Sequence, residues 1–268
     1  MVYVWNLTST LQRINVGAVN AVSALSFSAD GALLAVACLN KAHTVKVYDW
    51  KSGILRGSMS AGEYKTLAMT FSLDPLLGGG FRLLEAGVGH FNIFDGKSSD
   101  FVASKKGMFG APKFPNCLCA AAMPLPPAEG GNEFIIGLSN GSIGVLARGE
   151  RKISNNATVG FTTCTALHVM LLKEATAEEG PQFKVIAAGN HGLIKILDSE
   201  LGPLVEFDAY KSIPTLSFLG KVRGVKSVCV DRLKRKILFG TSGGEIGELD
   251  IGVTSIIFYC CFKCLISY

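Results

Sequence analysis

The chain has 268 residues, of which 49% are hydrophobic and 18% are charged, and its net charge is +5 at pH 7. This length and hydrophobic content are enough for one large domain or two small ones, which excludes a wholly disordered chain. The mild positive charge permits an acidic partner but does not require one.

Short apolar segments typical of β-strands recur along nearly the whole chain, separated by Gly, Asn, Asp or Pro. The first complete set begins with AVSALSFSADG at 21–31 and ALLAVAC at 32–38, where SADG forms a turn between two strands. VKVYD at 45–49 and ILRGSMS at 54–60 supply a third and a fourth strand. The order predicts a four-stranded unit whose strands run from an inner to an outer edge.

The third strand of this unit repeats along the chain. Its copies are VYVWN at 2–6, VKVYD at 45–49, FNIFD at 91–95, IGVLA at 143–147, IKILD at 194–198 and IGELD at 246–250. Their fourth residues are 43 to 52 positions apart. Such a period is close to that of β-propeller blades. We therefore predict an all-β, WD40-type β-propeller over residues 1–251, incomplete, with about five to six four-stranded blades.

An incomplete ring leaves blade faces uncovered, because blades bury their faces only against neighbouring blades. We therefore expect either a fragment of a longer protein or a smaller or strained ring. The tail, GVTSIIFYCCFKCLISY at 252–268, breaks the repeat pattern. VTSIIFY is a candidate final strand, and an artificial end such as translated non-coding sequence is the alternative. A membrane span here would be short and would contain Lys263.

Glycine-containing pairs join the second and third strands of three units, where a positive φ angle is favourable. These pairs are Asn140-Gly141, His191-Gly192 and Gly243-Gly244. Two Gly-x-Ser-x-Gly matches, at 137–141 and 240–244, include such pairs. A catalytic nucleophile elbow requires a strand, a turn and then a helix, whereas a strand follows both matches. We therefore predict structural turns and no catalytic residue.

The four histidines show no metal-ligand spacing, and three of them, His43, His90 and His191, fall near the start of a third strand. Turn or strand-edge positions are expected for these three. A propeller enzyme with a metal in its central channel would need acidic residues or histidines from several first strands. Those strands supply only His168 and Asp231. We therefore expect no metal, no cofactor and no enzymatic activity.

The cysteines and the N-terminus bear on the cellular compartment. Five of the eight cysteines lie in apolar strand-like segments, where free cysteine packs as a small hydrophobic residue: Cys38, Cys117, Cys119, Cys164 and Cys229. No signal peptide precedes the first strand. These observations favour a reducing, cytoplasmic location.

Three segments resemble the EMAP-like (echinoderm microtubule-associated protein-like) family. They are HTVKVYDWKSG at 43–53, KKGMFGAPKFPNCLCAA at 105–121 and RGVKSVCVDRLKRKILFGTSGGEIGELD at 223–250. The resemblance covers about residues 1–251. It implies an atypical propeller from a tandem pair, a tubulin or microtubule partner, and a place on the cytoskeleton. The family's HELP motif and its N-terminal coiled coil are not in this sequence, so the resemblance supports the fold more than it supports microtubule binding.

One basic cluster stands out near the end of the predicted propeller. It comprises Lys221, Arg223, Lys226, Arg232, Lys234, Arg235 and Lys236. Two interpretations remain open: a contact for an acidic partner such as a tubulin tail, or a solvated hairpin whose charges keep a sheet edge soluble. No aromatic residues alternate with these charges, so we expect no nucleic-acid partner. The sequence thus predicts a non-enzymatic interaction scaffold for tubulin, with a general adaptor for another protein complex as the alternative and no membrane partner.

Overall fold

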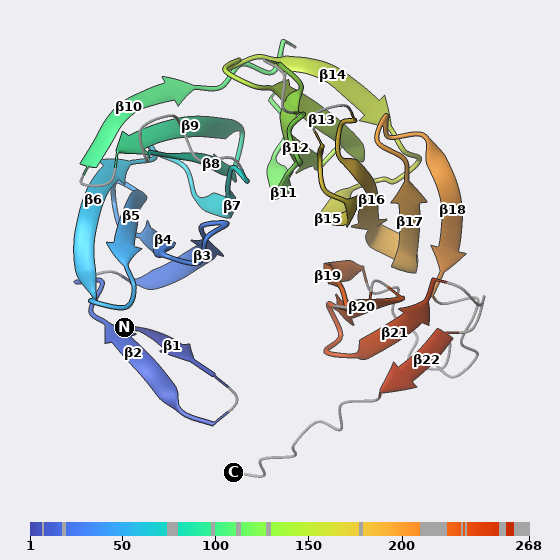
Figure 1. The fold of residues 1–268 in the computed structure, drawn as a ribbon, viewed down its shortest axis with the longest axis horizontal. Coiled ribbons are helices and arrows are strands. Elements are labelled where there is room, and N and C mark those ends of the chain that lie inside the picture. The colour runs from blue at the N-terminus through green and yellow to red at the C-terminus, as the bar shows by residue number, and fades with distance from the viewer. Residues whose placement is uncertain are drawn as a thin grey trace.

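The computed structural model describes residues 1–6, 8–17, 20–73, 80–97, 100–110, 114–126, 130–176, 179–209, 224–231, 233, 235–251 and 256–259. Five four-stranded antiparallel sheets and one two-stranded sheet follow one another around an open arc (Figure 1). A single 3-10 turn, η1 (Asn190–Gly192), is the helical element of the described residues. None of the described helical structure is long and apolar enough to cross a membrane.

Each four-stranded sheet is one blade, and the blades are numbered 1 to 5 in chain order. The two-stranded sheet consists of β1 (Val2–Trp5) and β2 (Thr10–Ile14). Blades 1 and 2 consist of β3 (Ala21–Phe27), β4 (Leu33–Leu39), β5 (Thr44–Asp49), β6 (Ile54–Ser60), β7 (Thr66–Phe71), β8 (Phe81–Gly87), β9 (His90–Lys97) and β10 (Asp100–Lys106). Blade 3 consists of β11 (Cys117–Ala122), β12 (Asn132–Leu138), β13 (Ser142–Ala147) and β14 (Ile153–Thr158). Blades 4 and 5 consist of β15 (Cys164–Lys173), β16 (Gln182–Gly189), β17 (Leu193–Leu197), β18 (Pro203–Asp208), β19 (Val225–Val230), β20 (Lys236–Thr241), β21 (Ile246–Asp250) and β22 (Ile256–Tyr259).

The strand order within the blades confirms the predicted propeller. The first strands of successive blades contact one another, so β3, β7, β11, β15 and β19 line the inner edge of the arc. The fourth strand of each blade lies at the outer edge (Figure 1). In blade 5 this outer position is taken by β22, which pairs with β21 through Leu249 and Ile256.

The hydrophobic core lies between blades rather than within them. One cluster joins Leu84 and Phe91 of blade 2 to Phe134 and Ile136 of blade 3. The other four clusters likewise join neighbouring sheets around the arc. Each blade therefore depends on its neighbours for burial, which is the energetic pattern of a repeat array.

The segment that follows β10 joins the outer strands of blades 2 and 3. The Gly107 amide donates a hydrogen bond to the Phe91 carbonyl oxygen at 2.8 Å. The next residue, Met108, forms a parallel bridge with Lys152 of blade 3. Phe109 is buried, and its ring meets the Phe91 ring edge-to-face with centroids 5.1 Å apart. This part of the 105–121 segment is therefore a structural joint between two blades.

The prediction that the strand cysteines pack as small hydrophobic residues is correct for three cysteines between neighbouring sheets and wrong for Cys229 in blade 5. Cys38, Cys117 and Cys164 are buried, and the five described cysteines are free. Burial raises the pKa of the Cys117 thiol to about 12, so this thiol stays protonated. Cys229 is exposed. Val228 packs toward blade 4, so in an alternating strand Cys229 faces the opposite side, where no described strand lies.

Candidate interaction surfaces

The basic cluster lies in blade 5, as far as the structure describes it. Lys226 on β19 and Arg235, just before β20, are exposed. Lys236 on β20 forms an ion pair with the Glu248 carboxylate on β21. Lys221, Arg223, Arg232 and Lys234 lie outside the described residues. Of the described members, Lys226 and Arg235 thus present charge at the surface, while the charge of Lys236 is compensated within the blade.

Asp231 shapes the turn that carries part of this cluster. Its Oδ1 accepts hydrogen bonds from the backbone amides of Lys236, at 2.8 Å, and Arg235, at 2.7 Å. These backbone hydrogen bonds, with that of Lys236 the strongest influence, lower the pKa of the Asp231 carboxyl. The acidic residue within the basic cluster therefore has a structural role in the β19–β20 connection.

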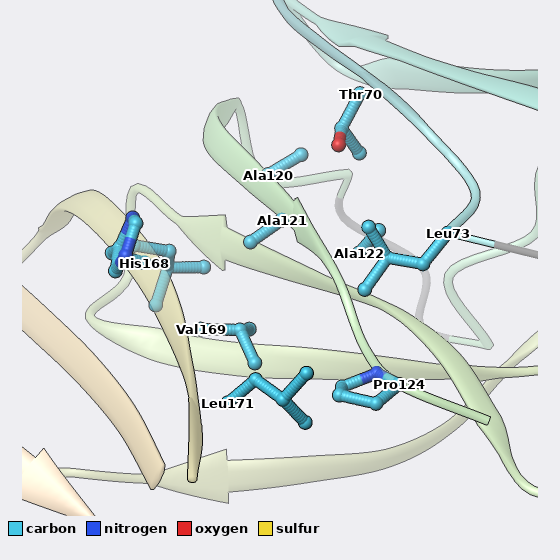
Figure 2. Close-up of a pocket in the computed structure, with 10 residues that line it drawn as sticks. Thr70, Leu73, Ala120, Ala121, Ala122, Pro124, His168, Val169 and Leu171 are labelled. Atoms are coloured by element: carbon cyan, nitrogen blue, oxygen red, sulfur yellow. The ribbon is translucent and has the colours of Figure 1, made fainter. Parts of the chain in front are cut away.

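An apolar pocket of about 270 Å³ lies on the inner edge of the arc, between the first strands of blades 2, 3 and 4 (Figure 2). Ala120, Ala121 and Ala122 of β11 line it, and their small side chains leave space between the larger residues around them. Those residues are Thr70, Leu73, Pro124, Leu167, His168, Val169 and Leu171. Burial lowers the pKa of His168, so its imidazole is neutral at pH 7. The pocket thus suits an uncharged, apolar group.

A second apolar surface lies at the N-terminal end of the arc. Met1, Tyr3, Trp5 and Leu25 contribute to a hollow of about 480 Å³. Trp5 is 78% exposed, whereas Tyr48, at the same position of the repeat, is 3% exposed. Tyr48 packs in a buried cluster with residues of β1 and β2, whereas Trp5 belongs to none of the buried clusters of the described residues. The exposure of Trp5 follows because no described sheet packs against its side chain.

Both Gly-x-Ser-x-Gly segments are structural turns, as predicted. Each segment ends in the hairpin between the second and third strands of its blade, which confirms the strand that follows it. The Ser139 amide donates to the Asn116 carbonyl oxygen at 2.9 Å, and the Ser242 amide donates to that of Gly224 at 2.9 Å. The Ser139 hydroxyl accepts a hydrogen bond from the Asn116 amide at 3.0 Å. The serines therefore fasten the hairpins to the preceding loops.

The three histidines predicted near third strands lie there: His43 directly before β5, His90 at the start of β9, and His191 in η1. Within the described parts of the chain, no group of three or more His, Cys, Asp or Glu side chains could hold a metal ion. His90 belongs to a buried network instead. Its Nε2 lies 3.0 Å from Glu85 Oε1, and its Nδ1 lies 3.1 Å from the Val88 carbonyl oxygen.

Both ring nitrogens of His90 therefore face oxygen atoms. A carbonyl oxygen only accepts, so Nδ1 donates to Val88, and Nε2 donates to the Glu85 carboxylate when His90 carries both protons. Asn92 Nδ2 donates to Glu85 Oε2 at 2.8 Å and to the Ala61 carbonyl oxygen at 3.0 Å, which links the network to the loop between blades 1 and 2. Burial opposes the charge on His90, but the hydrogen bond and the charge of Glu85 outweigh burial and raise the pKa of His90.

The raised pKa of His90 predicts that stability falls as the pH rises. This contribution is fully present below the unfolded pKa of about 6.5 and is lost as the pH passes through the higher folded pKa. We expect His90→Gln to remove this loss of stability at rising pH, as measured by urea unfolding across a pH series. His168→Gln is the control of opposite sign, because the lowered pKa of His168 costs stability at acidic pH. An unchanged pH profile in His90→Gln would contradict the protonated network.

The radial four-stranded blades and the inner first strands define this chain as a WD40-type β-propeller. It is similar in structure to the β-propeller domain of Cps50 (Swd1) from Myceliophteria thermophila, with a TM-score of 0.68 and 12% identity over 92% of this chain and 74% of that one. It is also similar to Raptor from Chaetomium thermophilum, with a TM-score of 0.65 and 17% identity over 92% of this chain and 21% of that one. These likenesses show the fold alone. No family model matches the chain.

Proposed function

We propose that this chain is a non-enzymatic protein-interaction platform. The observation that carries the proposal is the set of apolar and aromatic side chains that the array of blades leaves exposed, with the aromatic residues Trp5, Tyr64 and Phe114 foremost. Large exposed aromatic residues on a fixed scaffold are the side chains that contribute most to protein–protein binding. The propeller fold supports the same function, because its loops and edges offer several separate surfaces.

The partner we propose first is tubulin or the microtubule, which would place the protein on the cytoplasmic cytoskeleton. Support comes from the resemblance of segments 43–53, 105–121 and 223–250 to the EMAP-like family. The basic cluster of blade 5 adds a physical reason, since clustered positive charge attracts an acidic protein surface and speeds association. Exposed Lys226 and Arg235 are the described residues that would make this contact.

Microtubule co-pelleting tests this partner. We expect residues 1–268 to pellet with taxol-stabilised microtubules at low salt and to be released as salt rises, because screening weakens surface charge attraction. Reversing the charge at Arg232, Lys234 and Arg235 should weaken binding about tenfold or more. The matched control reverses the charge of exposed lysines elsewhere: Lys41, Lys51 and Lys97. Absence of binding by a folded chain, to microtubules and to soluble tubulin in gel filtration, would refute a tubulin partner.

A general adaptor for another protein complex is the second candidate. Exposed Tyr64 and Phe114 favour it, because they offer aromatic contacts outside the basic cluster of blade 5. A folded chain that binds neither microtubules nor tubulin would leave this candidate in place.

A further inference from the structure

Two aromatic residues that are far apart in the sequence meet at one turn of the propeller. Tyr64 lies in the loop between β6 and β7 and is 58% exposed, and Phe114 lies in the loop between β10 and β11 and is 61% exposed. The Tyr64 ring centroid lies 6.5 Å from that of His90. A Cβ atom added to Gly89, the residue before His90, would lie 4.0 Å from Phe114 Cβ. Both aromatic residues thus lie next to the turn between β8 and β9.

A backbone hydrogen bond and a ring contact attach the loops of the two aromatic residues to blade 2. Next to Tyr64, the Lys65 carbonyl oxygen accepts a hydrogen bond from the Val88 amide at 3.1 Å. The ring centroids of Phe114 and buried Phe109 lie 5.5 Å apart, and Phe109 itself packs against Phe91 in the core. Aromatic side chains have few rotatable bonds and lose little conformational entropy on binding, so they make effective anchors for a partner.

The charges around these rings are mainly positive. Lys65 and Lys106 are exposed, and neither forms an ion pair with another described residue. Lys106 is paired in register with Asn92 at the start of β9, and its charge acts on His90 of the same turn. Glu63, beside Tyr64, is exposed and acidic. Positive charge next to an aromatic surface is complementary to an acidic segment that carries an apolar side chain.

We propose that Tyr64 and Phe114, with Lys65 and Lys106, form a binding site for an acidic peptide segment of a partner protein. An apolar side chain of the peptide packs against the two rings, and its carboxylates meet the two lysines. Only two lysines contribute and the site is confined to one turn, which fits a short peptide better than the long charged groove of a single-stranded nucleic acid. The site rests on the proposed role as an interaction platform and names one of its surfaces.

Fluorescence anisotropy with designed peptides tests this site. The probe is fluorescein-labelled Gly-Glu-Asp-Phe-Glu-Asp-Leu-Gly, titrated with residues 1–268. Two comparison peptides replace either the acidic residues with Lys or the Phe and Leu with Ala. We expect the probe to bind more tightly than both, and Tyr64→Ala and Phe114→Ala each to weaken its binding about tenfold, as for residues at the centre of an interface. Leu204→Ala, at an apolar residue of β18 that is 50% exposed, is the matched control and should leave binding unchanged.

A charge exchange provides a second, independent readout. The double variant Lys65→Glu and Lys106→Glu should prefer the Lys peptide over the acidic probe, while its circular dichroism stays that of the parent chain. Equal binding of the acidic and Lys peptides, no effect of Tyr64→Ala and Phe114→Ala, or displacement of the probe by oligothymidylate would overturn the proposal. Microtubule co-pelleting of the same variants separates the peptide site from the proposed platform function. Variants that no longer bind the peptide but still pellet with microtubules would leave the platform function standing.

Discussion

Replacing Arg82 with Met is expected to lower the free energy of unfolding by about 3 to 5 kcal/mol, measured by urea unfolding. Arg82 lies on β8 of blade 2, and its side chain is 11% exposed. Its Nε donates to Asp95 Oδ1 at 2.6 Å, and its Nη1 donates to Glu133 Oε2 at 3.0 Å. Met keeps much of the apolar stem but removes every donor, so both carboxylates lose their charged partner.

The effect is large because Glu133 is itself buried, with 3% of its side chain exposed, and belongs to the next blade. Burial opposes the charged form of Arg82, but the hydrogen bond to Asp95 and the charge of Glu133 outweigh it and raise the arginine pKa. The guanidinium thus connects two blades while neutralising a carboxylate that the fold keeps from water. Loss of Arg82 should weaken the blade 2–blade 3 contact in particular.

Arg56→Met is the matched control. Arg56 Nη2 lies 2.9 Å from Asp49 Oδ2, but both residues are partly exposed and belong to blade 1. Exposed ion pairs contribute little, so this variant should change stability by at most about 1 kcal/mol. Equal losses in Arg82→Met and Arg56→Met would show that burial between blades does not strengthen the Arg82 pair. The double variant Arg82→Met and Glu133→Leu should recover part of the lost stability, because it removes the more buried of the two uncompensated carboxylates.

Gly141→Ala is expected to cost roughly 3 kcal/mol or more, the second large effect. Gly141 closes the β12–β13 hairpin with a φ angle of +84°, a conformation that favours glycine. In addition, a Cβ atom at this position would overlap the carbonyl oxygen of Phe161 in the loop between blades 3 and 4. That oxygen belongs to the backbone, so relief would require a shift of the whole loop.

Gly149→Ala separates these two causes. Gly149 has a similar φ angle of +78°, but no other described atom lies within 4 Å of an added Cβ. Only the conformational penalty applies, so we expect a loss of about 1 to 2 kcal/mol. Thermal unfolding of both variants, followed by circular dichroism, makes the comparison. If Gly141→Ala lost no more stability than Gly149→Ala, the close approach of blades 3 and 4 at this hairpin would be wrong.

The sequence by itself determined the blade plan. Strand patterning placed the fourth strand of blade 1, β6, at residues 54–60 and located the third strands of the blades, because alternating β-branched and apolar residues act locally. Local turn chemistry also located the hairpins. Positive φ angles at Gly141, His191 and Gly244 confirm that prediction, since a tight β-hairpin turn requires this conformation at its central residues.

Only the tertiary structure decided what each side chain faces. Trp5 and Tyr48 occupy one repeat position, yet one is exposed and the other buried, because Tyr48 packs against the two-stranded sheet and no described sheet packs against Trp5. The Arg82–Glu133 pair and the Tyr64–Phe114 site likewise join residues from different blades or from distant loops. Sequence patterns record which way a strand's side chains alternate, but the packing of one blade on the next sets their partners, their exposure and therefore the surfaces left for binding.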